Sequence, residues 1–204
     1  MKYYVVYLIS VIGLLVFGTT LKSEYSFVLQ IVFSILIFIV LFFWEYSLFN
    51  KTFDSDFKIK SQRKTIRLFY IGMTIFYILM IMQPNNSETL RSLIFAFWAI
   101  SFSEFIMVFV YKKRKPFTIF IKENELILNR RWTLKRNLTE LIQIRYDRFS
   151  KNLKLGFKTK REVSIKVTEY KTDEIQKLLE ILIKKSENNV FVPSNYEPKI
   201  KNSY

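Results

Sequence analysis

Long apolar runs fill the first half of the chain, whereas apolar and polar residues alternate through much of the second half. A helix needs roughly 20 apolar residues to cross a bilayer core about 30 Å thick. The apolar runs therefore predict four transmembrane helices, at residues 3–20, 25–49, 66–83 and 92–111. A cleaved signal peptide is the alternative for the first run. We favour a membrane helix, because residues 16–20 make a poor cleavage site and three more apolar runs follow.

The distribution of positive charge predicts how these helices are oriented. Cationic residues occur at Lys2, in the polar segment 50–64, which we interpret as a loop, and in the cluster 112–115. In a four-helix arrangement all three fall on one side of the membrane. Because cytoplasmic loops carry an excess of Lys and Arg, we expect a multi-pass protein of the inner (cytoplasmic) membrane with both termini in the cytoplasm. Pro116 then ends the fourth helix.

From residue 117 the apolar period changes to two, which is typical of strands that bury one face. The pattern predicts strands near 117–121, 126–128, 141–146, 153–157 and 163–167, with a hairpin turn at 123–125. The positions expected on the buried face are Phe117, Ile119, Ile121, Ile142, Ile144, Tyr146, Leu153, Leu155, Phe157, Val163, Ile165 and Val167.

An amphipathic helix is predicted to follow the strands. Thr172 is the expected N-cap, acidic residues fill the first turn and lysines fill the last turn, as the helix dipole prefers. Its apolar stripe comprises Ile175, Leu178, Leu179, Leu182 and Ile183. A sheet with one apolar face and one such helix make a two-layer α+β domain. Residues 187–204 form a polar tail.

The strand and helix pattern over residues 116–186 resembles the pleckstrin-homology-like (PH-like) domains of small bacterial membrane proteins. The resemblance rests on the runs 117–121, 125–129, 141–144, 153–157 and 163–167 and on the closing helix. It implies a strongly curved antiparallel sheet, or a partial barrel, capped by the C-terminal helix. Family members commonly carry one helical hairpin before this domain, so four helices are a departure. The family has no catalytic motif.

Composition excludes several classes of chemistry. The chain has no Cys and no His, which removes disulfides, Cys or His zinc sites, Cys nucleophiles and Ser-His-Asp triads. We expect no enzyme activity, no metal and no cofactor. The net charge is +15, and residues 112–204 hold 23 Lys and Arg against 11 Asp and Glu. A basic domain beside a bilayer favours anionic lipid headgroups as partners, together with a protein partner or a second copy, rather than nucleic acid.

Nine residues are the candidate contacts for a lipid or a partner. They are Lys112, Lys113, Arg114, Lys115, Arg130, Arg131, Trp132, Lys135 and Arg136. The alternative is that the first four only determine topology and that the others only form a solvated face.

Glu104 is the most informative polar residue inside the predicted helices, because an ionisable group at that depth suggests a functional site. Ser101 and Ser103 are its neighbours in sequence, and Glu45 lies near the end of the second helix. Glu104 is either structural, part of a transport or proton path, or in a helix placed one turn differently. No Lys or Arg inside the helices is available to pair with it.

Two functions remain open from the sequence. The first is a non-enzymatic membrane protein whose PH-like domain is an interaction or assembly module, with a regulatory or immunity-type role. The second is a small transporter or channel accessory subunit that uses Glu104.

Overall fold

The computed structural model describes residues 2–20, 25–65, 68–82 and 88–186, so the predicted tail at 187–204 lies outside the described residues. The chain divides into two compact units. A helical unit comprises Met1–Asn50 and Lys64–Arg114, and a sheet unit comprises Lys51–Arg63 and Lys115–Tyr204. The chain therefore passes between the units three times with no intervening linker.

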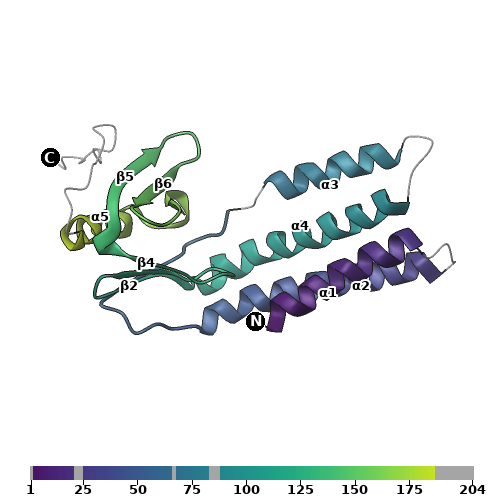
Figure 1. Cartoon of the computed structure of the whole chain (residues 1–204), viewed down its shortest axis with the longest axis horizontal. Helices are drawn as coiled ribbons and strands as arrows, with labels where there is room; N and C mark the ends of the chain where they lie inside the picture. Colours follow the sequence, from purple (N-terminus) through teal and green to yellow (C-terminus); the bar gives the residue numbers. More distant parts are fainter. Residues whose placement is uncertain (1, 21–24, 66–67, 83–87, 187–204) are drawn as a thin grey trace. The chain divides into compact units, whose positions relative to one another are not determined.

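The helical unit contains four α-helices, as the apolar runs predict. α2 packs against both α1 and α4, and α3 packs against α4 (Figure 1). A helix bonds its own backbone polar groups internally, which is what an apolar run in lipid requires. The bounds are α1 Lys2–Thr20, α2 Tyr25–Tyr46, α3 Leu68–Ile81 and α4 Glu88–Arg114, with a 3₁₀ turn, η1, at Ser47–Asn50.

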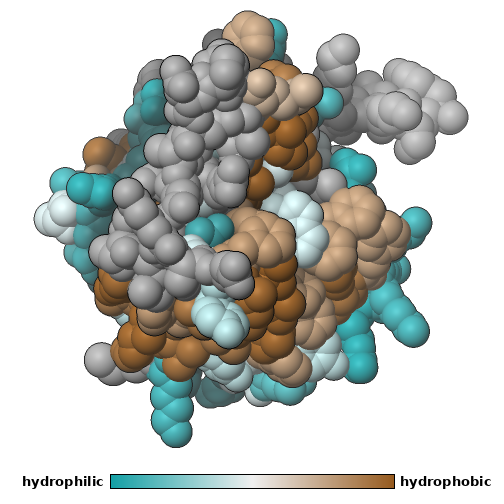
Figure 2. All heavy atoms as spheres, turned by 90° about the vertical axis from the view of Figure 1, so that its right-hand side faces the viewer, coloured by the Kyte–Doolittle hydropathy of each residue, from teal (hydrophilic) through white to brown (hydrophobic). Residues whose placement is uncertain are grey.

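The surface of the helical unit is strongly apolar. Its buried cluster is small, with Leu14, Ile37, Leu41, Trp44 and Ala99 at the centre. Large apolar side chains are at least half exposed on every helix, among them Ile9, Tyr25, Phe27, Phe69, Leu79 and Phe109. Figure 2 shows apolar side chains gathered on the face that is turned to the viewer. This distribution is the reverse of a soluble bundle and fits lipid-facing helices.

Two segments of the described chain are long and apolar enough to cross a membrane, Tyr25–Asn50 and Ser92–Arg114. The described apolar stretches of the other two helices, Lys2–Phe17 and Phe69–Met80, are shorter than a bilayer crossing requires. The four predicted helices are thus present, but length and composition identify two membrane-spanning candidates rather than four.

The ends of α4 differ from the prediction. The helix begins at Glu88 and continues through Arg114, beyond the predicted range of 92–111. Lys115 then adopts a left-handed conformation with φ of 47°, and Pro116 follows. A left-handed residue commonly terminates a helix, and proline cannot continue one. The cluster 112–115 is therefore mostly the last turn of a helix.

The sheet unit contains two antiparallel sheets and one α-helix (Figure 1). The first sheet has the order β1-β2-β3-β4, with β1 Phe57–Lys60, β2 Phe117–Lys122, β3 Glu125–Leu128 and β4 Leu134–Asn137. The second has the order β5-β6-β7, with β5 Leu141–Asp147, β6 Asn152–Phe157 and β7 Val163–Lys166. Between and after them lie η2 Leu138–Glu140, η3 Val167–Glu169 and α5 Thr172–Lys185.

Strand β1 is the main departure from the sequence interpretation. It lies within segment 50–64, which we interpreted as a polar loop, and it pairs with β2 through Ile59 opposite Ile119. Ile59 is fully buried in the core of the sheet unit. The sheet unit therefore also includes residues from between α2 and α3, outside the range of 116–186 predicted for the domain.

The predicted buried faces hold in β6 and β7, whereas β2 buries both of its faces, with Phe120 only 1% exposed, and β5 departs from the pattern. Leu153, Leu155 and Ile165 are fully buried. In β5, however, the register shifts between Leu141 and Gln143. A bulge adds one residue and moves the following side chains to the other face, so Leu141 and Ile144 are buried while Ile142 is 40% exposed. The prediction that Ile142, Ile144 and Tyr146 share a buried face is wrong for Ile142.

Helix α5 covers the core with Ile175, Leu178, Leu179 and Leu182, as the stripe predicts. Ile183 is 49% exposed, and Ile181 packs against the core in its place. The N-cap residue is Lys171, which makes no side-chain capping bond, so the prediction of Thr172 as the cap is wrong. One helix therefore closes a single core that both sheets share.

Candidate functional site

A buried ion cluster in the helical unit joins two carboxylates to one ammonium group. Lys64 Nζ lies 2.5 Å from Glu45 Oε1 and 3.9 Å from Glu104 Oε1. The side chains of Lys64, Glu45 and Glu104 are only 13%, 5% and 2% exposed. The ammonium also lies 5.9 Å from the centre of the Tyr111 ring, within the range of a cation–π contact.

Three different segments supply this cluster. Glu104 and Tyr111 are seven residues apart in α4, which places them on the same helix face two turns apart. Glu45 comes from the last turn of α2, and Lys64 from the connection that precedes α3. Both carboxylates stand out within the apolar runs of the sequence, whereas Lys64 lies outside the helices, in the connection before α3. No cation inside the helices was expected to pair with Glu104, and the structure supplies one from this connection.

The charges of the cluster determine what it can do. Removing ions from water costs several kcal/mol per ion unless they are paired. Three ionisable side chains that lie almost wholly out of water therefore depend on one another for compensation of their charges. Such an arrangement either fixes the packing of the three segments or exchanges a proton or cation. Both possibilities predicted for Glu104 therefore extend to Glu45 and Lys64.

The serines predicted beside Glu104 have different partners. Ser101 Oγ lies 3.3 Å from Thr74 Oγ1 and links α4 to α3. The Ser103 hydroxyl is buried and has no hydrogen-bond partner among the described residues. Among the described residues, neither of these serine hydroxyls bonds the Glu104 carboxylate.

A line of buried polar residues runs along α2 and was not predicted from the sequence. Ser26, Gln30 and Ser34 are spaced by four residues and each is less than 10% exposed. Ser26 Oγ donates to the carbonyl of Phe17, and Ser34 Oγ donates to the carbonyl of Phe95 at 2.9 Å. Hydrogen bonds between helices stabilise packing in lipid. The four-residue spacing was the available signal.

The nine predicted contact residues do not form one cluster. Lys112, Lys113 and Arg114 are exposed in the last turn of α4, where cations suit the helix dipole. Lys115 and the other five belong to the sheet unit.

Within the sheet unit the other predicted contacts occupy two places. Arg130, Arg131 and Trp132 lie in the β3–β4 connection, where a guanidinium nitrogen of Arg130 donates to the Ser164 carbonyl. Lys135 and Arg136 lie on β4, and Lys135 pairs with Glu125 at 3.0 Å.

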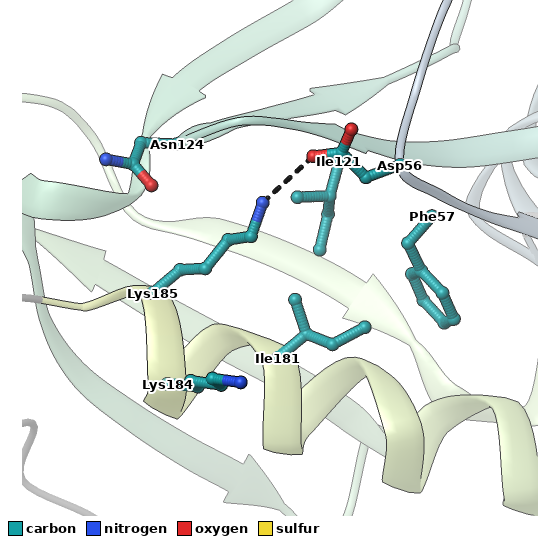
Figure 3. A pocket seen from close by; sticks show the side chains of 7 residues that line it. All are labelled: Asp56, Phe57, Ile121, Asn124, Ile181, Lys184 and Lys185. Carbon is teal, nitrogen blue, oxygen red and sulfur yellow. Dashed lines mark hydrogen bonds and ion pairs between the residues drawn. The ribbon is translucent and has the colours of Figure 1, made fainter.

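The sheet unit also has an open pocket of about 510 Å³ between the first sheet and the end of α5 (Figure 3). Phe57, Ile121 and Ile181 give it an apolar lining, and polar groups are contributed by Asp56, Asn124, Lys184 and Lys185. Figure 3 shows Lys185 reaching to Asp56, whose carboxylate is 3.1 Å away.

Asp56 fastens β1 to the β2–β3 turn at this pocket. Its carboxylate accepts a hydrogen bond from the Glu123 amide at 2.8 Å, and Lys185 also donates to the Glu123 carbonyl. The Glu123 amide, followed by Lys185, holds the pKa of Asp56 below its ordinary value. Asp56 and Lys185 therefore already bond one another, and Asp56 links β1 to the β2–β3 turn.

No protein-family model, curated protein or solved structure matches this chain. No group of three or more acidic residues in the described parts of the chain could hold a metal ion. The function of the chain is therefore inferred from the two units and from the residues described above.

Proposed function

We propose that this chain is a non-enzymatic integral membrane protein that crosses the cytoplasmic membrane four times. Both termini lie in the cytoplasm, and the sheet unit is a PH-like interaction or assembly module. The PH-like assignment is supported by two antiparallel sheets that share one core beneath a C-terminal helix. The module recognises a membrane partner or a second copy, in a regulatory or immunity-type role.

The observation that carries this proposal is the pairing of β1 with β2 on either side of α3 and α4. β1 precedes α3 in the chain, β2 follows α4, and the two strands are hydrogen-bonded neighbours. A chain that leaves a sheet and returns to it must cross a bilayer an even number of times in between. Since α4 has the length and composition for one crossing, the pairing supports a second crossing by α3.

Topology is testable with single cysteines, because the chain has none of its own. We expect a membrane-impermeant maleimide to label the Asn85→Cys variant in intact cells and the Lys160→Cys variant only after permeabilisation. Labelling of both variants from the same side would contradict four crossings. A chain that is extracted from membranes by alkaline carbonate would contradict membrane integration itself.

The module is testable by crosslinking in cells. We expect the full chain to give a crosslinked complex that is lost in an Ile59→Asp variant, which places a charge in the core of the sheet unit. The variant's helices should stay in the membrane fraction, which separates loss of the module from loss of the protein. A monomeric chain with no crosslinked partner in native membranes would count against the proposal.

A second candidate function follows from the ion cluster. Two buried carboxylates that share one ammonium form a site able to take up and release a proton or a cation. A small transporter or channel accessory subunit would use such a site. In proteoliposomes containing a pH-sensitive dye, we expect proton or cation flux that the Glu104→Gln variant abolishes and the exposed Glu180→Gln control retains. If the flux does not exceed that of empty vesicles, the chain does not transport a proton or cation by itself.

A further inference from the structure

A fully exposed aromatic side chain stands at the tip of the β5–β6 hairpin. Phe149 is exposed over its whole surface. The turn that carries it is nevertheless well bonded, since Asp147 Oδ1 accepts from the amides of Phe149 and Ser150 at 3.1 and 3.2 Å. Lys154 lies 3.1 Å from the same carboxylate group. The hairpin therefore presents Phe149 to its surroundings on an ordered turn.

Cations flank this aromatic residue. Arg148 and Lys151 are both exposed on either side of the tip. The acidic residue of the turn, Asp147, is already bonded to the turn amides and to Lys154. An aromatic tip that is surrounded by positive charge complements a surface with a negatively charged outer layer and an apolar interior.

The hairpin tip lies at the end of the sheet unit from which the chain leaves toward α3. Lys151 accepts a hydrogen bond from the Val167 amide. The next two residues of that segment, Thr168 and Glu169, accept bonds from Arg63 and Gln62. Arg63 is the last residue of the sheet unit before α3 begins. A short run of hydrogen bonds thus connects the Phe149 turn to an exit point of the chain.

The β3–β4 connection also carries an exposed aromatic residue beside cations, and it lies at the same end of the sheet unit as the Phe149 turn. Trp132 is 62% exposed and follows Arg130 and Arg131. Asn129, which opens this connection, bonds through its side chain to the carbonyl of Phe117, two residues after the chain enters the sheet unit at Lys115. At the opposite end of the strands, the turns at 123–124 and 158–162 contain no aromatic residue.

We propose that Phe149 and Trp132 insert into the headgroup region of an anionic bilayer, with Arg148, Lys151, Arg130 and Arg131 against the lipid phosphates. Aromatic side chains favour that depth, and basic residues near an anionic surface are attracted to it. The helices joined to this end of the sheet unit bring a bilayer within reach, so the inference rests on the proposed membrane integration. The ligand is the lipid surface rather than a free phosphate.

The test uses full-length, single-cysteine variants in proteoliposomes. Phe149→Cys carries an environment-sensitive fluorophore, and Lys160→Cys, in the turn at the opposite end, is the matched control. In vesicles that contain phosphatidylglycerol, we expect nitroxide-labelled lipid to quench the label at 149 at least about twofold more than the label at 160. Replacing Arg148 and Lys151 with Gln should lower the equilibrium constant between the inserted and the withdrawn hairpin roughly fivefold per cation.

The possible outcomes separate the inference from the function on which it rests. Quenching of the label at 149 by aqueous iodide, with none by the labelled lipid, would overturn the inference while the protein remains integral. A label protected from both quenchers would indicate a protein on this surface and would also overturn it. Loss of the chain from the vesicles in alkaline carbonate would overturn the proposed function instead. Equal quenching in neutral and anionic vesicles would contradict the proposed contact between the cations and anionic lipid.

Discussion

The ammonium nitrogen of Lys64 lies 2.5 Å from a carboxylate oxygen of Glu45, although 19 positions separate the two residues in sequence. Both side chains are almost completely buried. The ion pair ties the end of α2 to the segment that leads into α3, and Glu104 extends it to α4. The cluster therefore joins α2, α4 and the segment that precedes α3.

Replacing Lys64 with Met should strongly destabilise the helical unit. The variant leaves two buried carboxylates without this ammonium, and breaking a buried ion pair on one side costs about 3–5 kcal/mol. Unfolding of the full chain in detergent, followed by circular dichroism, measures the loss. The exposed Lys51→Met variant is the matched control and should change stability by less than about 0.5 kcal/mol.

A double variant decides whether the loss comes from the pair itself. Adding Glu45→Gln to Lys64→Met removes one uncompensated charge, so we expect it to recover about 1–3 kcal/mol. Additive losses in the two single variants would contradict a direct interaction between the side chains.

Gly13 should be far less tolerant of a larger side chain than Gly72. A Cβ at Gly13 would lie 2.5 Å from an edge carbon of the Phe33 ring, whereas a Cβ at Gly72 meets nothing within 4 Å. Leucine gains about 0.8–1 kcal/mol of helix propensity at either site, but overpacking at Gly13 costs about 1–3 kcal/mol. We expect Gly72→Leu to raise the melting temperature and Gly13→Leu to lower it. Equal shifts would show that α1 does not pack closely on α2.

Truncating Ile59 should damage the sheet unit more than truncating Ile142. Ile59 is fully buried on β1, and Ile142 is 40% exposed on β5. Loss of a fully buried isoleucine side chain typically costs about 2–5 kcal/mol, and an exposed one much less. Limited proteolysis of the two alanine variants compares them within one unit. Greater damage from Ile142→Ala would support the loop interpretation of segment 50–64.

Asp147 should contribute to the acid sensitivity of the sheet unit. Hydrogen bonds from Lys154, and then from Ser150, lower the pKa of Asp147 from 3.8 to about 2. Because the pKa falls on folding, its stabilising effect is complete above pH 3.8 and disappears as the pH falls through about 2. The Asp147→Asn variant should therefore melt lower than the wild type at pH 7 and converge with it near pH 2.

The control for this titration is Glu180→Gln, on the exposed face of α5. As an exposed surface substitution, it should leave the melting temperature at pH 7 nearly unchanged. If the Asp147→Asn variant loses as much stability in acid as the wild type, the ionised Asp147 carboxylate does not stabilise the sheet unit.

Periodicity predicted the elements that depend on local sequence. The four apolar helices, the β2–β3 hairpin, the strands from 153 to 167 and the helix at 172–185 are all present. Each has enough residues in one pattern to set its own structure. The presence of Glu45 and Glu104 at special positions was also visible, because a carboxylate stands out within an apolar run.

The features that sequence analysis missed all depend on distant partners. β1 has only four residues, and its pairing with β2 spans more than fifty positions. The bulge in β5 reverses one face without altering the alternation before it. Lys64 looked like an ordinary loop lysine, because only the fold places it between two carboxylates. In these three cases the residues that meet in space are far apart in the sequence, and no short sequence pattern indicates that they meet.

The placement of β1 also sets an order for biosynthesis. The strand leaves the ribosome before α3 and α4 are made, and its partner β2 leaves after them. Under the proposed topology, the first sheet closes only after α3 and α4 have returned the chain to the side of the membrane that holds β1. A nascent chain in which this helix pair is misinserted would keep β1 as an unpaired edge with Ile59 uncovered, the kind of segment that quality-control proteases recognise. On that proposal, closure of the sheet depends on correct insertion of the two helices that separate its strands.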